Sequence, residues 1–221
     1  MSLSDWEFHA SSGVTFSINL FTPIVSLGSG RLAMPDIGAL TQTNINVTTA
    51  SGRTRGVTRG KLRSLFRYDT LVTAAVLGLA FCQSRSDHDL TSNGTAYFAY
   101  LRQADSKLHI SRMGPTNSTI AGFFGAPTFL DSGGFPFVPG NNVVFSLEVE
   151  WIVDIAELGG VAIFLRQGFA TNFSDLTTVI TVLDTSSPLT TSTSESVFAG
   201  VPATFAGAWN LDFDQTTLFI P

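Results

Sequence analysis

The sequence predicts an all-β protein, an antiparallel β-sandwich, and three observations support this. Apolar and polar residues alternate with a period of two in many short segments, which is typical of strands with one buried face. Segments rich in Gly, Pro, Ser, Asn and Asp separate these runs, at 26–31, 86–94, 131–142, 157–160 and 184–196. No segment shows convincing helical periodicity, so about a dozen short strands in two packed layers are expected.

The strands follow in chain order, starting with residues 13–20. There Val14, Phe16, Ile18 and Leu20 alternate with polar residues. Residues 61–67 alternate in the same way, with Leu62 on the core face. Residues 95–102 and 107–112 flank a short polar turn and predict a hairpin. The pattern continues at 143–153, 161–167, 177–183 and 211–220.

For one segment, residues 147–158, a helix is an alternative to a strand. Leu147, Trp151, Ile155 and Leu158 would lie near one face of a helix over 147–158. The neighbouring β-branched residues 143, 144, 149, 152 and 153 favour a strand instead.

Composition limits the classes of protein to consider. The 221 residues are 44% hydrophobic and 13% charged, which suits one folded domain, 1–221, and not a disordered chain. The net charge of −5 excludes a protein that wraps nucleic acid. The lone Cys82 excludes an intrachain disulfide and is expected to be buried. We expect no signal peptide and no membrane insertion, since the N-terminus lacks a signal pattern and the apolar run at 70–81 is too short to span a bilayer.

Half of the basic residues lie in one segment. Residues 53–67 hold six of the 12 Lys and Arg and no acid, which leaves 6 basic and 17 acidic residues elsewhere, a balance of −11. Such a segment is a candidate partner-binding surface for an acidic neighbour, although a solvated strand edge would look the same. The candidates are Arg53, Arg55, Arg59, Lys61, Arg63 and Arg67.

Polar clusters that suggest metal or catalytic chemistry are sparse. Asp87, Asp89 and Asn93 share one loop and offer hard oxygen ligands, but their spacing matches no calcium loop, and an ordinary polar turn explains them as well. The three His residues show no metal-ligand spacing, so we expect no metal and no cofactor.

The order of features resembles the concanavalin A-like lectin and glucanase jelly roll, which includes laminin-G-like domains. Residues 78–114 resemble that family's strand pair, loop and hairpin, with Arg112 before the Gly that ends the segment. Residues 143–168 with 179–184 resemble its long curved strand and the two that follow. Residues 206–220 resemble its terminal strand, which in this fold lies beside the first, here residues 3–8.

The resemblance also raises the question of catalysis. Glucanases of this family have a catalytic strand with three acids, in which one residue separates the first Glu from an Asp and one or two residues separate that Asp from a second Glu. If Glu148 and Glu150 are aligned with the first two acids of this pattern, the position of the third acid falls on Ile152 or Val153. If Asp154 and Glu157 are aligned with the last two acids instead, the position of the first acid falls on Ile152. Both frames are incomplete, so the four acids are expected to be the solvent-facing side of a strand, and the protein is expected not to be an enzyme.

The resemblance then implies a non-enzymatic structural role. Similar domains are common in tailed-bacteriophage virions, as capsid decoration or cement proteins or as tail and fibre parts that touch host glycans. The expected partners are other virion proteins, copies of this chain in a homo-oligomer, and surface glycans, with assembly in the bacterial cytoplasm. A stand-alone carbohydrate-binding protein is the first alternative, and a glucanase-like glycoside hydrolase is the second.

Overall fold

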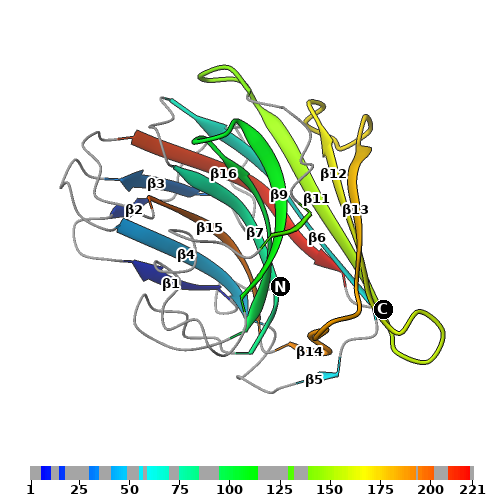
Figure 1. Ribbon diagram of the computed structural model, residues 1–221. Coiled ribbons are helices and arrows are strands. Elements are labelled where there is room, and N and C mark those ends of the chain that lie inside the picture. Colours follow the sequence, from blue (N-terminus) through cyan, green and yellow to red (C-terminus); the bar gives the residue numbers. More distant parts are fainter. Residues whose placement is uncertain are drawn as a thin grey trace.

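A computed structural model of the protein describes residues 6–10, 15–17, 30–34, 41–48, 55–56, 59–69, 75–84, 95–113, 129–131, 139–192, 194–201 and 209–219. Side chains are described for 59–69, 75–84, 95–113, 130–131, 139–191, 195–198 and 211–219. All regular elements within these ranges are strands (Figure 1). The strands are β1 Trp6–Ala10, β2 Thr15–Ser17, β3 Gly30–Met34, β4 Thr41–Thr48, β5 Arg55–Gly56, β6 Arg59–Tyr68, β7 Val76–Gln83, β8 Ala96–Arg102, β9 Lys107–Met113, β10 Phe129–Asp131, β11 Phe145–Asp154, β12 Gly160–Gly168, β13 Thr177–Asp184, β14 Thr191–Ser192, β15 Ser194–Val201 and β16 Trp209–Phe219.

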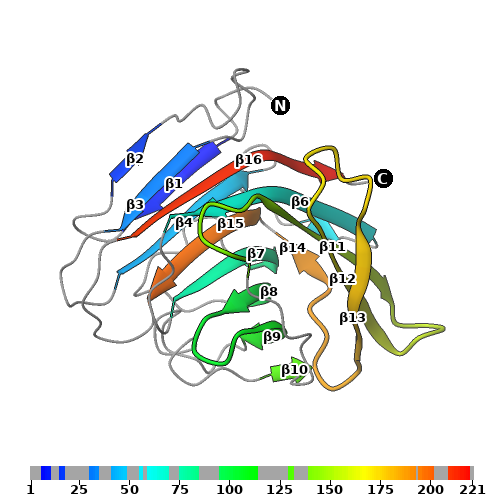
Figure 2. The ribbon, with the colours of Figure 1, turned by 90° about the horizontal axis from the view of Figure 1, so that it is seen from above.

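The strands form two antiparallel seven-stranded sheets that pack face to face, which confirms the predicted all-β sandwich. The first sheet has the order β1-β4-β15-β7-β8-β9-β10, and the second has the order β13-β12-β11-β6-β16-β3-β2. Figure 2 shows them as two stacked layers. A small third sheet pairs β14 with β5. The predicted hairpin is confirmed as β8 and β9, and the segment that left a helix open is the strand β11.

One expectation about topology is wrong, because the first and last strands do not pair. β1 lies at the edge of the first sheet and pairs with β4, whereas β16 lies inside the second sheet between β6 and β3. The chain crosses between the sheets after β1, so β3 becomes the N-terminal neighbour of β16. β1 alternates apolar and polar residues, as the start of β16 does, but alternation alone does not identify a strand's partner.

The main core lies between the sheets and is rich in aromatic side chains. Phe81 of the first sheet stacks on Trp151 of the second, with ring centroids 5.0 Å apart. Phe66 and Phe145, on neighbouring strands of the second sheet, stack at 5.6 Å. Such contacts let the sheets bury large apolar areas, the main stabilising term in folding.

Gly60 has a specific packing role in this core. A Cβ atom on Gly60 would lie 2.1 Å from the indole ring of Trp151, its cross-strand partner on β11. Only glycine leaves room for that ring, and the close approach fixes the indole against β6.

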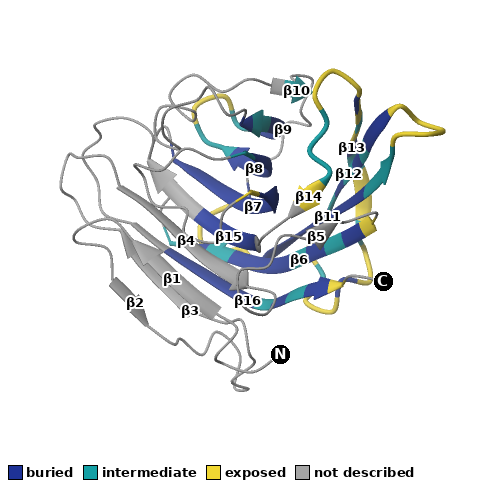
Figure 3. Ribbon diagram, turned by 90° about the horizontal axis from the view of Figure 1, so that it is seen from below, coloured by how far each residue is buried: buried dark blue, intermediate teal, exposed yellow. Residues whose placement is uncertain are grey.

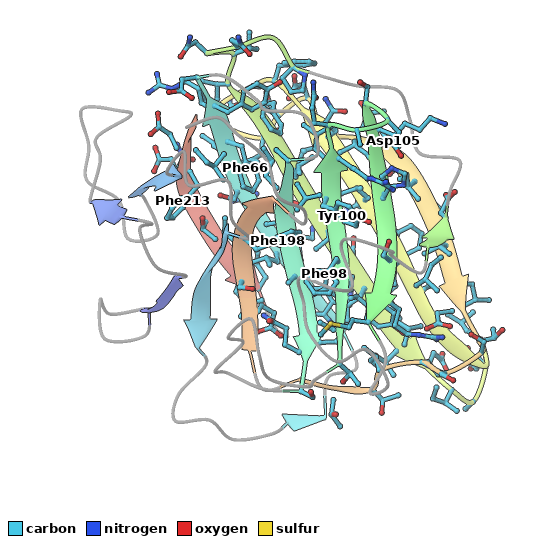
Figure 4. The ribbon with its side chains drawn as sticks, turned by 60° about the vertical axis from the view of Figure 1, so that its left-hand side comes forward. Phe66, Phe98, Tyr100, Asp105, Phe198 and Phe213 are labelled. Carbon is cyan, nitrogen blue, oxygen red and sulfur yellow. The ribbon has the colours of Figure 1, made fainter. Side chains whose placement is uncertain are left out.

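On the strands of the first sheet whose side chains the structure describes, β7, β8, β9 and part of β15, the outward-facing residues are buried as well. In β7, Leu77, Leu79 and Phe81 face the main core, while alternate residues point the other way and are buried as well. We call these residues, with their neighbours on β8, β9 and β15, the outer aromatic cluster: Val76, Ala80, Ala96, Phe98, Tyr100, Met113 and Phe198. Figure 4 labels Phe98, Tyr100 and Phe198 of this cluster, together with Phe66 and Phe213 of the main core. Cys82 is buried, as expected.

Candidate functional site

The candidate site is the outward face of the second sheet, where β6, β11 and β12 lie side by side. On β11, residues 147, 149 and 151 face the core, so Glu148 and Glu150 point outward. Glu148 lies between Arg63 of β6 and Arg166 of β12 in the strand register. Glu150 lies between Lys61 of β6 and Phe164 of β12. Two acidic and several basic side chains therefore meet on this face.

Five side chains on this face form one ion-pair network: Arg59, Lys61, Glu148, Glu150 and Arg166. Arg166 donates from Nη1 to Glu148 Oε1 at 2.7 Å, and its Nη2 lies 2.8 Å from Glu150 Oε2. Arg59 donates to Glu150 from Nε at 3.0 Å and also from Nη2. Lys61 Nζ lies 3.6 Å from Glu148 Oε1. The single guanidinium of Arg166 thus bridges both carboxylates.

The network changes the ionisation of its members. Burial alone would raise the pKa of Glu150, but hydrogen bonds from Arg59 and Arg166 outweigh burial and hold its pKa below the ordinary value. Burial would lower the pKa of Arg166, and its bonds to Glu150 and Glu148 raise it instead. Glu150 is therefore held as a carboxylate and not as a protonated acid.

The expectation that these acids are solvent-facing is wrong for two of the four. Glu148 and Glu150 are only 4% and 5% exposed, whereas Asp154 is half-buried and Glu157 is exposed. Glu148 and Glu150 point away from the apolar core, as alternation predicts, but arginine and lysine side chains from the flanking strands cover them. Alternation identifies the face of a strand and does not say what covers that face.

The basic segment divides into residues with different surroundings. Arg67 donates to Asp212 of β16, with Nη2 to Oδ2 at 2.6 Å, so it is engaged within the chain. The alternation predicted for Lys61, Arg63 and Arg67 is confirmed, since Leu62 and Phe66 between them are buried. Arg59 is the most exposed of the described basic side chains in this segment, at 58%.

Arg63 has aromatic surroundings in place of an acid. Its Cζ lies 4.3 Å from the ring centroid of Phe173 and 5.0 Å from that of Phe219. Both distances lie within the range of cation–π attraction. Phe173 comes from the loop between β12 and β13, and Phe219 ends β16.

Some predicted site residues lie outside what the structure describes. Arg53 and the loop residues Asp87, Asp89 and Asn93 are not in the described ranges, and of Arg55 only the backbone is described. Among the described residues no group of three or more metal-ligating side chains occurs. In the same part of the chain, no helix is long and apolar enough to cross a membrane.

A second polar cluster was not predicted from the sequence. Asp184 at the end of β13 accepts hydrogen bonds from Arg112 Nη1 at 2.6 Å and from Tyr97 Oη at 2.7 Å. Tyr97 Oη also accepts the backbone N–H of Leu189 at 2.9 Å. Burial would raise the pKa of Asp184, but Tyr97 and Arg112 hold it below its ordinary value. These three side chains tie β8 and β9 of the first sheet to β13 of the second.

The sequence contained only part of the information needed to predict this cluster. Arg112 stands out as a basic residue in a strand, and Asp184 opens a turn-rich segment. The two are 72 residues apart, so only the stacking of β9 against β13 brings them together.

An open depression of about 330 Å³ lies beside the β12–β13 loop. Its lining includes the half-exposed ring of Phe169, the carboxylate of Asp175 and the side chains of Gln167, Thr177 and Thr178. Asp175 accepts the backbone N–H groups of Phe169 and Ala170 at 2.8 and 2.9 Å, which holds the loop closed. Figure 3 shows the exposed residues of this part of the molecule, around β12 and β13.

Comparison with known proteins identifies the fold. No family model matches the sequence, and no curated protein matches it. The solved structures that match include the PL-14 alginate lyase from Aplysia kurodai, with a TM-score of 0.61 at 11% identity over 99% of this chain and 92% of that one. The exoplasmic/lumenal domain of VIP36, in a Ca²⁺/Man3GlcNAc-bound form, matches with a TM-score of 0.54 at 11% identity over 97% and 85%. A mutant of the Emp46p carbohydrate recognition domain matches with a TM-score of 0.50 at 12% identity over 96% and 88%. The chain therefore has a lectin-like jelly-roll sandwich.

Proposed function

We propose that this protein is a non-enzymatic binding module and a structural component of a tailed-bacteriophage virion, in capsid decoration or in the tail or fibre. In this proposal the lectin-like sandwich joins neighbouring virion proteins or copies of itself, and its surface contacts host glycans. The proposal requires no cofactor and no metal. It places the protein in the virion after assembly in the bacterial cytoplasm.

The observation that carries the non-enzymatic part is the ion-pair network. Glycoside hydrolysis needs one protonated acid and one carboxylate that reaches the sugar. Glu148 and Glu150 were the strongest candidates in the sequence, and here both are buried under Arg59, Lys61 and Arg166. Because Glu150 has a lowered pKa, it is a poor proton donor near neutral pH. The geometry supports a structural use of these acids.

Composition and charge support attachment to neighbours. The chain has few charged residues for its size and many Phe, which suits a protein that buries surface against partners. Arg59 keeps more than half of its side chain exposed while bonded to Glu150. It is the described member of the basic segment best placed to meet an acidic neighbour, and Arg53 and Arg55 lie close to it in sequence.

The virion role is tested on purified particles. Phage particles from a host carrying the gene would be banded by density, and the protein quantified by mass spectrometry against the major capsid protein. We expect a fixed copy number per particle that survives washing in high salt. Absence from banded particles would overturn the virion role.

The non-enzymatic part is tested separately with purified protein. Laminarin-type β-glucan and alginate would be incubated with wild type and with Glu150→Gln, and products followed by reducing ends and by absorbance of unsaturated sugars. We expect no products above buffer. Turnover that the substitution abolishes would show an enzyme.

A stand-alone carbohydrate-binding protein is the second candidate, and exposed aromatic residues favour it. Phe169 and Phe219 are 49% and 44% exposed, and exposed aromatic rings can stack on sugar rings. The shared fold with carbohydrate recognition domains is compatible with this candidate but shows the fold alone. Glycan binding by protein that is absent from particles would select it over the virion role.

A further inference from the structure

Arg63 differs from the other described basic residues on its face of the second sheet. Arg59, Lys61, Arg67 and Arg166 each have a carboxylate partner within the chain. Arg63 has none among the residues that the structure describes, and its contacts are the rings of Phe173 and Phe219. Its Nε is buried without a hydrogen-bond partner in that same part of the chain. A partly exposed guanidinium is thus held in place with its charge uncompensated.

The loop that supplies one of the two rings is itself firmly built. Phe173 has a φ of +61°, a conformation that bulky residues rarely adopt, and its N–H donates to Ala170 O at 3.0 Å. Asn172 Oδ1 accepts the N–H of Ser174 at 3.1 Å, and Asp175 accepts two further N–H groups of the loop. Strained backbone persists where its surroundings enforce it, often at binding sites. Here the enforced conformation buries Phe173 over Arg63, with 9% of it exposed.

The nearest acid in the strand register is already committed. Glu148 lies opposite Arg63 on β11, but its carboxylate contacts Arg166 at 2.7 Å and Lys61 at 3.6 Å. Among the described side chains of β6, β11, β12 and β16 on this face, five cations, which include Arg67, stand against four carboxylates, a local excess of one positive charge; the carboxylates are Glu148, Glu150, Asp212 and Asp214. An anion is attracted to this face although the whole chain carries −5.

Phe219 adds an apolar surface next to this charge. Its ring is half-exposed while it contacts the guanidinium. A rigid cation beside an exposed ring suits a ligand unit that has an oxyanion and an apolar face. A pyranose ring with a carboxylate or sulfate has both, whereas an acidic protein side chain has only the oxyanion.

We propose that Arg63 and Phe219 form a recognition site for an acidic sugar unit of a polysaccharide. The guanidinium binds the carboxylate or sulfate, and the C–H face of the sugar packs on Phe219. Phe173 positions Arg63 without touching the ligand, so the arginine loses little conformational freedom on binding. This inference rests on the proposed contact with glycans and names the chemical class of that glycan.

The test compares three polysaccharide probes of matched length. Oligogalacturonate supplies carboxylates, dextran sulfate supplies sulfates, and dextran is neutral. Binding would be measured by calorimetry at low and at high salt. We expect wild type to bind at least one acidic probe and not dextran, with affinity that falls as salt rises. The two acidic probes distinguish a carboxylate ligand from a sulfate ligand.

Substitutions then locate the site. Arg63→Gln should lower affinity for the acidic probe about tenfold or more, because a charge-assisted bond is lost. Arg63→Lys should recover little, since an ammonium lacks the planar guanidinium that two rings hold. Phe219→Leu should lower affinity about fivefold, through loss of the ring. Lys107→Gln, the same charge change at the start of β9 in the first sheet, is the matched control and should bind as wild type.

The possible failures are distinguishable. Equal binding of dextran and the acidic probes would overturn the charge recognition and leave glycan contact standing. Binding to acidic probes that Arg63→Gln and Lys107→Gln weaken equally would overturn this site. No binding to any probe, with Arg63→Gln instead preventing self-association, would assign the site to an acidic protein surface and overturn the glycan. Circular dichroism of each variant ensures that losses are not due to unfolding.

Discussion

Both outward faces of the sandwich carry a cluster of buried side chains, but the chemistry of the two clusters differs. The first sheet carries the outer aromatic cluster, in which Phe98 and Phe198 meet edge to face at 5.3 Å. The second sheet carries the ion-pair network, in which Glu148 and Glu150 are nearly as inaccessible as those rings. Apolar burial stabilises in proportion to area and needs no specific partner, whereas buried charge is tolerated only with its partners in place. The first face should therefore respond to changes of volume and the second to changes of charge.

The largest effect should come from the apolar face. Phe198→Ala should lower the free energy of unfolding by about 4 kcal/mol, since the fully buried ring leaves a cavity. Denaturant unfolding measures this loss, which should be the same at pH 5 and pH 8. Phe198→Leu, the milder control, should lose far less. A loss under 1 kcal/mol for the alanine variant would mean that the cluster contributes little.

The charged face should respond next, through its shared cation. Arg166→Met keeps most of the stem but removes the charge that bridges Glu148 and Glu150, and should cost about 2 kcal/mol. Arg59 and Lys61 remain as partners, which limits the loss. Adding Glu148→Gln and Glu150→Gln to the same chain should restore part of the stability. If the triple variant is less stable than Arg166→Met, repulsion between the carboxylates is not the cause.

Acid should destabilise the protein through its ion-paired carboxylates, an effect that the apolar outer aromatic cluster does not share. The pKa values of Glu150 and Asp184 are lowered in the folded protein, so their contribution is fully present above their ordinary values in the unfolded chain, about 4. It is lost as pH falls through the lower folded values. The thermal midpoint should be flat from pH 6 to 8 and fall below pH 4. In Glu150→Gln the fall should be smaller, and an equal fall would show that other carboxylates cause it.

The smallest effect should come from the rim of the network. Lys61 is 36% exposed in its side chain, and its nitrogen is 3.6 Å from Glu148. Lys61→Met should change the free energy of unfolding by about 0.5 kcal/mol, because exposed pairs contribute little. Urea unfolding at low and high salt measures this change. A loss close to that of Arg166→Met would mean that Lys61 is as important to Glu148 as the arginine.

The sequence predicted local structure well and long-range pairing poorly. Alternation placed β6, β11, β12 and the β8–β9 hairpin, because a period of two follows from strand geometry alone. It also separated Glu148 and Glu150 from the core side of β11. It did not show that Arg166 and Arg59, the latter 91 residues from Glu150, would cover these acids. The same limit explains the wrong partner predicted for β16.

Only part of the candidate site could be predicted, because the sequence shows local clusters but not the contacts between distant segments. The cluster of cations in 53–67 is visible in sequence, and so are the acids of β11. The two aromatic contacts of Arg63 come from Phe173 and Phe219, which lie in a loop and a strand far along the chain. Nothing local distinguishes these two among 19 phenylalanines.

The packing of Trp151 gives the protein an internal optical reporter. Its indole is fully buried, its Nε1 has no hydrogen-bond partner among the described residues, and it lies between Phe81 of the opposite sheet and the bare backbone of Gly60. An indole in such dry surroundings should fluoresce at short wavelength and shift to the red once water reaches it. In a variant with Trp6→Phe and Trp209→Phe, which leaves Trp151 as the single tryptophan of the three in the sequence, separation of the two sheets can thus be followed through the emission of this side chain.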